Sequence, residues 1–336
     1  MKTTREPRDF NTIGRLLPQA VRLPNVHSSP NAPHAVTIPA NEAPLPASGA
    51  AHQESGRLGA FVELTKPRIT RAVLTTSAIG MALAPGQLRL SAALLSLVGT
   101  VLVVSSANAL NMWWERDIDG RMQRTAERPL PSGRLAAREA LVFGVVLGLV
   151  AIPVLLLVNK LTAALGLLAL VSYVLVYTPM KAVSPYALHV GAVPGAIPPL
   201  MGYATVAGRV DGVALAIFAV LLLWQIPHFV AISLVRGEEY AAASLPVYGI
   251  AKPANVVQRT VALYTYATVA ASLVPYFLGA FSAAYLVVAG LLGLGFIALA
   301  HRVTVEDHGA AQRFFRASVA YLILVYGALV LARGVA

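Results

Sequence analysis

Long apolar segments alternate with short polar ones along most of this chain. From about residue 69 onward, about nine of these segments are long enough to cross a bilayer as helices, since a span needs about 20 mainly apolar residues. They cover residues 69–85, 91–111, 137–158, 161–178, 188–207, 212–235, 260–280, 282–301 and 315–333. Uninterrupted runs of this length are typical of helices and not of a barrel. The pattern predicts an all-α polytopic membrane protein with about nine transmembrane helices.

Residues 1–56 differ in composition from the rest. They hold many prolines among Ser, Asn and Ala and contain few aromatic residues, which predicts a disordered tail. They lack the apolar segment of a secretory signal, and Glu6 and Asp9 disfavour a mitochondrial targeting peptide. The sequence is therefore divided into a disordered N-terminal tail, 1–56, and a membrane domain, 57–336.

The composition agrees with a membrane protein, because 57% of the residues are hydrophobic and only 12% are charged. The absence of cysteine excludes disulfides and thiolate metal sites. The net charge of +11 could indicate nucleic-acid binding, but its placement favours another explanation. Most Lys and Arg residues fall in loops on one side of the predicted helices. The other side holds only Arg89, Lys160, Arg209 and Arg333.

This asymmetry follows the positive-inside rule. It predicts that the N-terminus and the long polar loops are cytoplasmic and that the C-terminus is outside. We expect a bacterial cytoplasmic (inner) membrane, with the mitochondrial inner membrane as the alternative. This topology and an anionic substrate account for the basic excess, so no nucleic-acid partner is expected, and membrane lipid surrounds the spans.

A dense group of charged residues, 111–128, directly follows the second apolar segment. If the helix continues, steps of 100° per residue place Asn111, Glu115 and Asp119 within an arc of about 80°, with Asp117 on the opposite side. Hard divalent cations such as Mg²⁺ prefer oxygen ligands, and the nearby arginines suit phosphate. The pattern indicates a magnesium–diphosphate site at the membrane surface. The alternative is a solvated helix end, with Glu115 paired to Arg116 or Arg121.

A second polar group follows the sixth apolar segment, at residues 224–240. The same arithmetic places Gln225, His228, Arg236 and Glu239 within an arc of about 80°, provided that the helix continues through this region. Pro227 and Gly237 argue against an unbroken helix.

Several motifs resemble those of a known family. The residues Asn111-x3-Glu115-x3-Asp119, followed by Arg124-Thr125-x2-Arg128-Pro129, resemble the first acidic motif of the UbiA-type intramembrane prenyltransferases. Within that superfamily, three stretches are similar to the haem O synthase (protohaem IX farnesyltransferase) family. These are Leu64-Thr65-Lys66-Pro67-Arg68, Tyr177-Thr178-Pro179-x-Lys181 and Trp224-Gln225-x-Pro227-His228-Phe229. The resemblance covers about residues 58–333.

The resemblance implies nine transmembrane helices around a central cavity and Mg²⁺-dependent transfer of a farnesyl group from farnesyl diphosphate to haem B, which gives haem O. Asn111, Glu115 and Asp119 would hold Mg²⁺. The diphosphate would be bound by Lys66, Arg68, Arg124, Arg128, Tyr177 and Lys181. Glu239 would bind metal or position the diphosphate, with Arg236 as its partner or as a phosphate ligand, and an interfacial ion pair is the alternative for these two.

The haem pocket is expected to include Gln225 and His228, with His228 as a hydrogen-bonding residue in preference to an iron ligand. Trp224 is assigned to the same pocket, and an interfacial aromatic residue is the alternative for it. Haem A synthase and terminal oxidase assembly factors are the partners that the family suggests. The residues alone leave two alternative functions: a UbiA-type prenyltransferase acting on an aromatic quinone precursor, and a membrane transporter. The transporter is disfavoured because the ionisable residues gather at one interface instead of mid-membrane.

Overall fold

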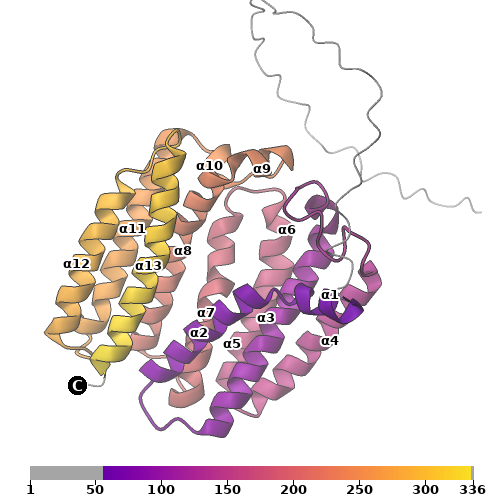
Figure 1. The fold of residues 1–336 in the computed structure, drawn as a ribbon. Coiled ribbons are helices and arrows are strands. Elements are labelled where there is room, and N and C mark those ends of the chain that lie inside the picture. Colours follow the sequence, from indigo (N-terminus) through magenta and orange to yellow (C-terminus); the bar gives the residue numbers. More distant parts are fainter. Residues whose placement is uncertain (1–55, 334–336) are drawn as a thin grey trace, which may run out of the picture. The chain divides into compact units, whose positions relative to one another are not determined.

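The computed structural model describes residues 56–333, and that part of the chain contains helices and no strand (Figure 1). The tail predicted for residues 1–56 lies outside the described residues, apart from Gly56. The helices in chain order are α1 (Arg57–Leu64), α2 (Pro67–Leu83), α3 (Leu90–Asp119), α4 (Ala137–Leu156), α5 (Lys160–Val171), the π-helical segment η2 (Ser172–Tyr177), α6 (Thr178–Lys181), α7 (Ala187–Ala207), α8 (Gly212–Val235), α9 (Gly237–Ala242), α10 (Tyr248–Ala251), α11 (Ala254–Phe277), α12 (Ala283–Ala300) and α13 (His308–Arg333).

Eight helices in the described part are long and apolar enough to cross a membrane. They are α3, α4, the continuous stretch Lys160–Lys181 formed by α5, η2 and α6, and then α7, α8, α11, α12 and α13. The first of the expected segments, 69–85, corresponds to α2, which has 17 residues and packs mainly against α7. The molecule is thus the all-α membrane protein that the sequence predicts, with a span count close to nine.

Glycines allow α2 and α7 to approach closely. A side chain at Gly80 would overlap the backbone of Pro199, and one at Gly202 would overlap the backbone of Ser77. Small residues at such crossings are typical of membrane helices, since close backbone contact maximises van der Waals packing where no hydrophobic effect operates. This crossing holds α2, and therefore the segment that precedes it, against α7.

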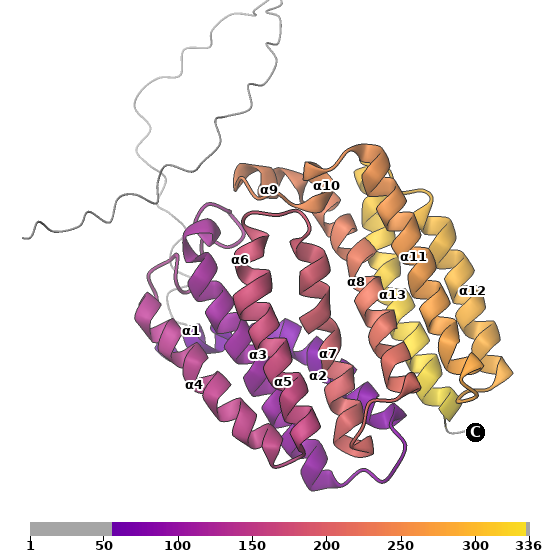
Figure 2. The same cartoon turned by 180° about the vertical axis from the view of Figure 1, so that it is seen from behind.

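Successive spans reverse direction, so their connections collect at two ends (Figures 1 and 2). The end that carries α9 and α10 also carries the links 120–136, 182–186 and 301–307. The opposite end carries only short links. The four basic residues expected on the sparsely charged side all belong to that end: Arg89, Lys160, Arg209 and Arg333. The polar groups recognised in the sequence therefore share one end of the helices.

Candidate active site

The first polar group lies on a single unbroken helix. Because α3 runs for 30 residues without interruption, the expected stripe is preserved. Asn111, Glu115 and Asp119 are only 2%, 5% and 1% exposed, whereas Asp117 is exposed and lies 3.8 Å from the side chain of Arg116. The periodicity thus separates the buried polar face from the exposed carboxylate as predicted.

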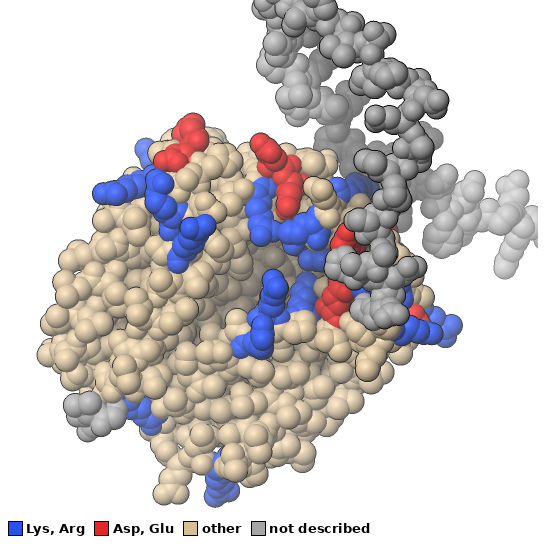
Figure 3. Space-filling view, in the orientation of Figure 1, with Lys and Arg blue, Asp and Glu red and all other residues tan. Residues whose placement is uncertain are grey.

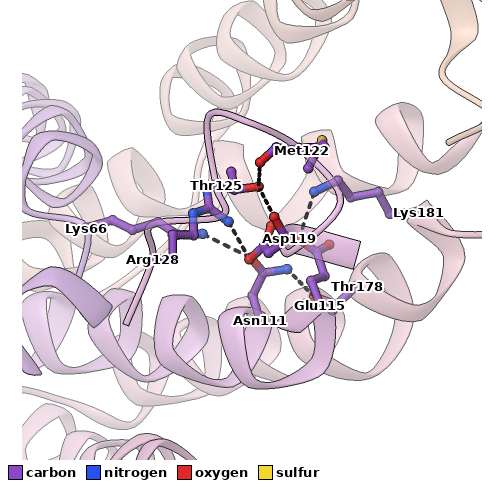
Figure 4. A network of polar contacts seen from close by, with 9 residues as sticks. All are labelled: Lys66, Asn111, Glu115, Asp119, Met122, Thr125, Arg128, Thr178 and Lys181. Carbon is purple, nitrogen blue, oxygen red and sulfur yellow. Dashed lines mark hydrogen bonds and ion pairs between the residues drawn. The ribbon is translucent and has the colours of Figure 1, made fainter. Parts of the chain in front are cut away.

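Each of the three buried oxygen-bearing side chains meets a cation from a different segment of the chain (Figure 4). The contacts are Lys66 Nζ to Asn111 Oδ1 at 2.9 Å, Lys181 Nζ to Glu115 Oε2 at 3.0 Å and Arg128 Nη1 to Asp119 Oδ2 at 2.7 Å. The alternative in which Glu115 pairs along its own helix is therefore wrong. The partners come from the segment before α2, the end of α6 and the link after α3.

Two threonines that the sequence did not single out support this network. Asn111 Nδ2 donates to Thr178 Oγ1 at 3.4 Å, and the buried hydroxyl of Thr125 donates to the backbone carbonyl of Asp119 at 2.7 Å. Thr125 thereby folds the link after α3 back over the end of that helix. Both residues fall inside the quoted family motifs, which was the only signal that pointed to them.

The network brings like charges together. The pKa of Lys66 is lowered to about 7, first by burial and then by the nearby cations Arg128 and Lys181, while Glu115 and Asp119 act in the opposite direction. A multivalent anion bound among these cations would relieve their repulsion. The electrostatics therefore fit a phosphate-bearing ligand.

The π-helical segment η2 leads into this site. It ends at Tyr177, four residues before Lys181, and π-helical turns occur frequently at functional sites because they change the direction of the side chains that follow. The ring of Tyr177 packs where any side chain at Gly191 would overlap it. Tyr177 and Lys181 also line a cleft of about 100 Å³ whose other walls include Phe229, Tyr240 and Tyr248.

Arg124 joins the two polar groups, and it contacts a residue 115 positions later in the sequence. Its Nε lies 3.3 Å from Glu239 Oε2, and both side chains are about one-third exposed. Beside this pair, Met122 packs with Ala243 and Leu245. The link after α3 and the segment after α8 therefore cover the same end of the site.

The predicted stripe through the second polar group is wrong. Helix α8 continues through Pro227 but ends at Val235, and Arg236 has non-helical dihedral angles. Arg236 is exposed, and it makes no ion pair with another residue of 56–333. The same is true of Arg68 at the start of α2. Neither arginine joins the network of Figure 4.

The three expected haem-pocket residues are buried but face different neighbours. Trp224 Nε1 donates to the backbone oxygen of Ser318 on α13 at 2.7 Å, and His228 stacks on Trp224 with ring centroids 4.4 Å apart. Gln225 instead donates to the backbone oxygen of Ala192 on α7 at 3.0 Å. Thus α8 is held between α7 and α13 by polar contacts.

The tautomer of His228 follows from its partner. The Ser318 hydroxyl donates its proton to the backbone oxygen of Phe315 at 2.7 Å, so Ser318 Oγ accepts from His228 Nδ1 across the 2.7 Å contact between them. The proton then resides on Nδ1, and Nε2 carries the lone pair. Nδ1 of His228 is thus engaged in a hydrogen bond to Ser318, and the place of this residue in a haem pocket stays a prediction.

The donor set on α3 fits Mg²⁺. Its members are an amide and two carboxylates on one buried face, which are the hard oxygen ligands that this cation prefers. No group of three or more His, Asp or Glu side chains that could hold a metal occurs within residues 56–333. The set therefore depends on the amide of Asn111 in addition to its two carboxylates.

Lys and Arg side chains also surround a hollow in one face of the molecule (Figure 3). The model of the UbiA prenyltransferase family matches residues 73–325, which is most of the chain. The chain belongs to the UbiA prenyltransferase family. This membership confirms the fold class and the resemblance drawn from the motif around Asn111.

Relatives within the UbiA prenyltransferase family carry a more specific name. The protoheme IX farnesyltransferase of Anaeromyxobacter sp. (strain Fw109-5) is 46% identical over 80% of this chain and 91% of its own length. The protoheme IX farnesyltransferase of Myxococcus xanthus (strain DK1622) is also 46% identical, over 81% of this chain and 94% of its own.

Solved structures show the same fold. A digeranylgeranylglyceryl phosphate synthase has a TM-score of 0.72 at 17% identity and covers 82% of this chain and 98% of its own. A UbiA homolog from Archaeoglobus fulgidus, bound to GPP and Mg²⁺, has a TM-score of 0.58 at 15% identity, with 80% and 99% covered. These likenesses concern the fold, since the identities are low.

Proposed function

We propose that this chain transfers the farnesyl group of farnesyl diphosphate to a vinyl group of haem B, with addition of water, to give haem O and diphosphate. Relatives named protoheme IX farnesyltransferase, 46% identical over nearly their whole length, support the choice of acceptor over an aromatic quinone precursor. The single structural observation that carries the proposal is the buried meeting of three oxygen ligands on α3 with three cations from elsewhere.

The site suits departure of the diphosphate. Asn111, Glu115 and Asp119 would hold Mg²⁺, which when bound would neutralise the charge that develops on the diphosphate as its bond to farnesyl C1 breaks. The remaining phosphate charge would be met by a set of donors at the same end of the helices: Lys66, Arg124, Arg128, Lys181 and the hydroxyl of Tyr177. Such groups stabilise developing charge best where water is scarce.

The rest of the reaction needs no nucleophile from the protein. As the C1–O bond breaks, its electron pair leaves with the diphosphate, and the electron-rich vinyl carbon of haem forms the new bond to C1. Water then adds to the cation on the porphyrin side chain and loses a proton. The residues of the site would bind and orient the reactants and limit the access of other water.

We assign the binding of haem B, the farnesyl acceptor, to residues of α8. Trp224, Gln225 and His228 would form one wall of the haem pocket, because their mutual positions are held by contacts to α7 and α13. Arg236 and Glu239 would act at the aqueous edge of the same site, where Glu239 already contacts Arg124. Glu239 would position the diphosphate through that arginine.

We place the active site and the N-terminus on the cytoplasmic side of a bacterial inner membrane, with the C-terminus outside. The basic residues at the α9–α10 end support this orientation. The chain has no cysteine, so single cysteines report position cleanly. Ser132→Cys should react with an impermeant thiol reagent only in inside-out vesicles, and Gln87→Cys only in right-side-out ones; the reverse pattern contradicts the orientation.

Purified protein tests the function directly. Given haem B, farnesyl diphosphate and Mg²⁺, it should form a more hydrophobic haem whose mass has increased by a farnesyl group and one hydroxyl group. Omission of Mg²⁺ should prevent this. Product formed only with a phenolic acceptor would overturn the assignment. Copurification with haem A synthase or an oxidase assembly factor would identify a recipient of haem O.

A further inference from the structure

Lys66 has an unusual backbone conformation. Its φ of 48° and ψ of 68° lie in the left-handed region, and Ser244 is the only other non-glycine residue within 56–333 with a positive φ. Side chains with a Cβ rarely adopt this conformation, and a residue before proline is pushed further toward the extended region. Because Pro67 follows, Lys66 needs contacts with other residues to keep this left-handed conformation.

Two hydrogen bonds to the backbone carbonyl of the preceding residue, Thr65, provide these contacts. Thr65 O accepts one hydrogen bond from Thr70 Oγ1 at 2.8 Å and another from Asn108 Nδ2 at 3.2 Å. The direction of this carbonyl relative to Lys66 is what the angle φ of Lys66 measures. Two donors that fix the carbonyl therefore also fix the backbone of Lys66.

Asn108 is well placed for this task. It is 3% exposed and lies one turn before Asn111 on the same face of α3, so its position is set by the helix that bears the oxygen ligands. The left-handed backbone directs Lys66 so that its Nζ reaches Asn111 Oδ1 at 2.9 Å. Relaxation of Lys66 to an extended conformation would turn its Cβ, and the ammonium would leave the site.

We propose that Asn108 is a positioning residue for diphosphate binding: its amide holds the Thr65 carbonyl and thereby keeps the Lys66 ammonium at the diphosphate. This rests on the proposed function only in that the site binds diphosphate; it does not depend on the identity of the acceptor. Asn108 acts through Lys66, so its contribution to binding exists only while Lys66 is present.

A double-mutant cycle tests this dependence. The affinity of purified protein for inorganic diphosphate with Mg²⁺ is measured by calorimetry for wild type, Asn108→Ala, Lys66→Ala and the double variant. Asn108→Ala should weaken binding about tenfold in the presence of Lys66, equivalent to about 1.4 kcal/mol, and less than about twofold in its absence. Equal loss in both backgrounds would mean that Asn108 only joins α3 to the segment before α2, and no loss in either would also overturn the proposal.

Two further variants distinguish a specific loss of binding from a loss of folding. Thr70→Val removes the other hydrogen bond to Thr65 O and should weaken binding by a smaller factor, again only when Lys66 is present. Thr75→Val removes a comparable bond on α2, to Arg71 O, and should leave binding and thermal stability unchanged. A wild type that binds diphosphate but transfers no farnesyl to haem would refute the proposed function alone, whereas failure to bind diphosphate would refute both.

Discussion

The polar groups on α3 and after α8 look alike in sequence but differ in three dimensions. In both, residues at a helical spacing were expected on one face. On α3 the helix is unbroken, and Asn111, Glu115 and Asp119 share a buried face. In the second group, helix α8 ends at Val235, so Arg236 and Glu239 do not continue the face formed by its last turns. Residue spacing therefore predicts a shared helix face only where the backbone remains helical.

The partners differ as well. The α3 side chains meet cations from distant segments, at 2.7–3.0 Å and with little exposure. The ion pair of Glu239 with Arg124 is longer, at 3.3 Å, and about one-third exposed. Buried charges depend on their partners far more than exposed ones, which are screened by water. We therefore expect the two groups to tolerate substitution very differently.

The largest effect is expected on α3. Asp119→Asn removes a buried charge that faces the diphosphate site, so kcat for haem O formation should fall about 1,000-fold, as is typical when a group that stabilises the transition state electrostatically is lost. Analysis of extracted haems by chromatography measures this. The matched control, Asp117→Asn, changes an exposed carboxylate on the other side of α3 and should stay within about twofold of wild type. Near-normal activity of Asp119→Asn would remove this residue from the metal site.

A smaller effect is expected in the haem pocket. His228→Phe keeps an aromatic ring against Trp224 but loses the hydrogen bond to Ser318, which should raise KM for haem B about tenfold, the order of a lost buried hydrogen bond. KM for farnesyl diphosphate should not change. As a control, His301→Phe alters an exposed histidine near Tyr266 and should affect neither constant. An equal rise in both KM values would contradict a role on the acceptor side.

A modest effect is expected at the aqueous edge. Glu239→Gln should lower kcat/KM for farnesyl diphosphate by at most about fivefold, since exposed ion pairs contribute up to about 1 kcal/mol. The control Glu238→Gln changes the neighbouring exposed residue and should leave kcat/KM unchanged. If Glu239→Gln proves as inactive as Asp119→Asn, the second group binds metal directly and the contrast between the two regions disappears.

No effect is expected from removal of residues 1–50. All proposed site residues lie between Lys66 and Glu239, so the shortened protein should retain full activity once inserted into the membrane. Activity per mole of purified protein is the measurement. A loss of turnover in correctly inserted protein would show that the tail contributes to the site.

Some site residues could be assigned from the sequence and others could not. Asn111, Glu115 and Asp119 follow from spacing along one helix, which is a local property. The cation that each one meets does not, because Lys66, Arg128 and Lys181 belong to three other segments. Arg68 and Arg236 carry the same charge in similar motifs, yet both are exposed and take no part in the network.

The amino-acid sequence by itself determined the membrane-spanning helices, the polar end they share and the buried face of α3, because hydrophobic length and helical period act locally. Only the tertiary structure decided which charges meet. Helix crossings such as that of α2 on α7, the left-handed turn at Lys66 and the break after Val235 depend on contacts between segments far apart in the chain. Those contacts turn a row of oxygen ligands into a site with three cations around it.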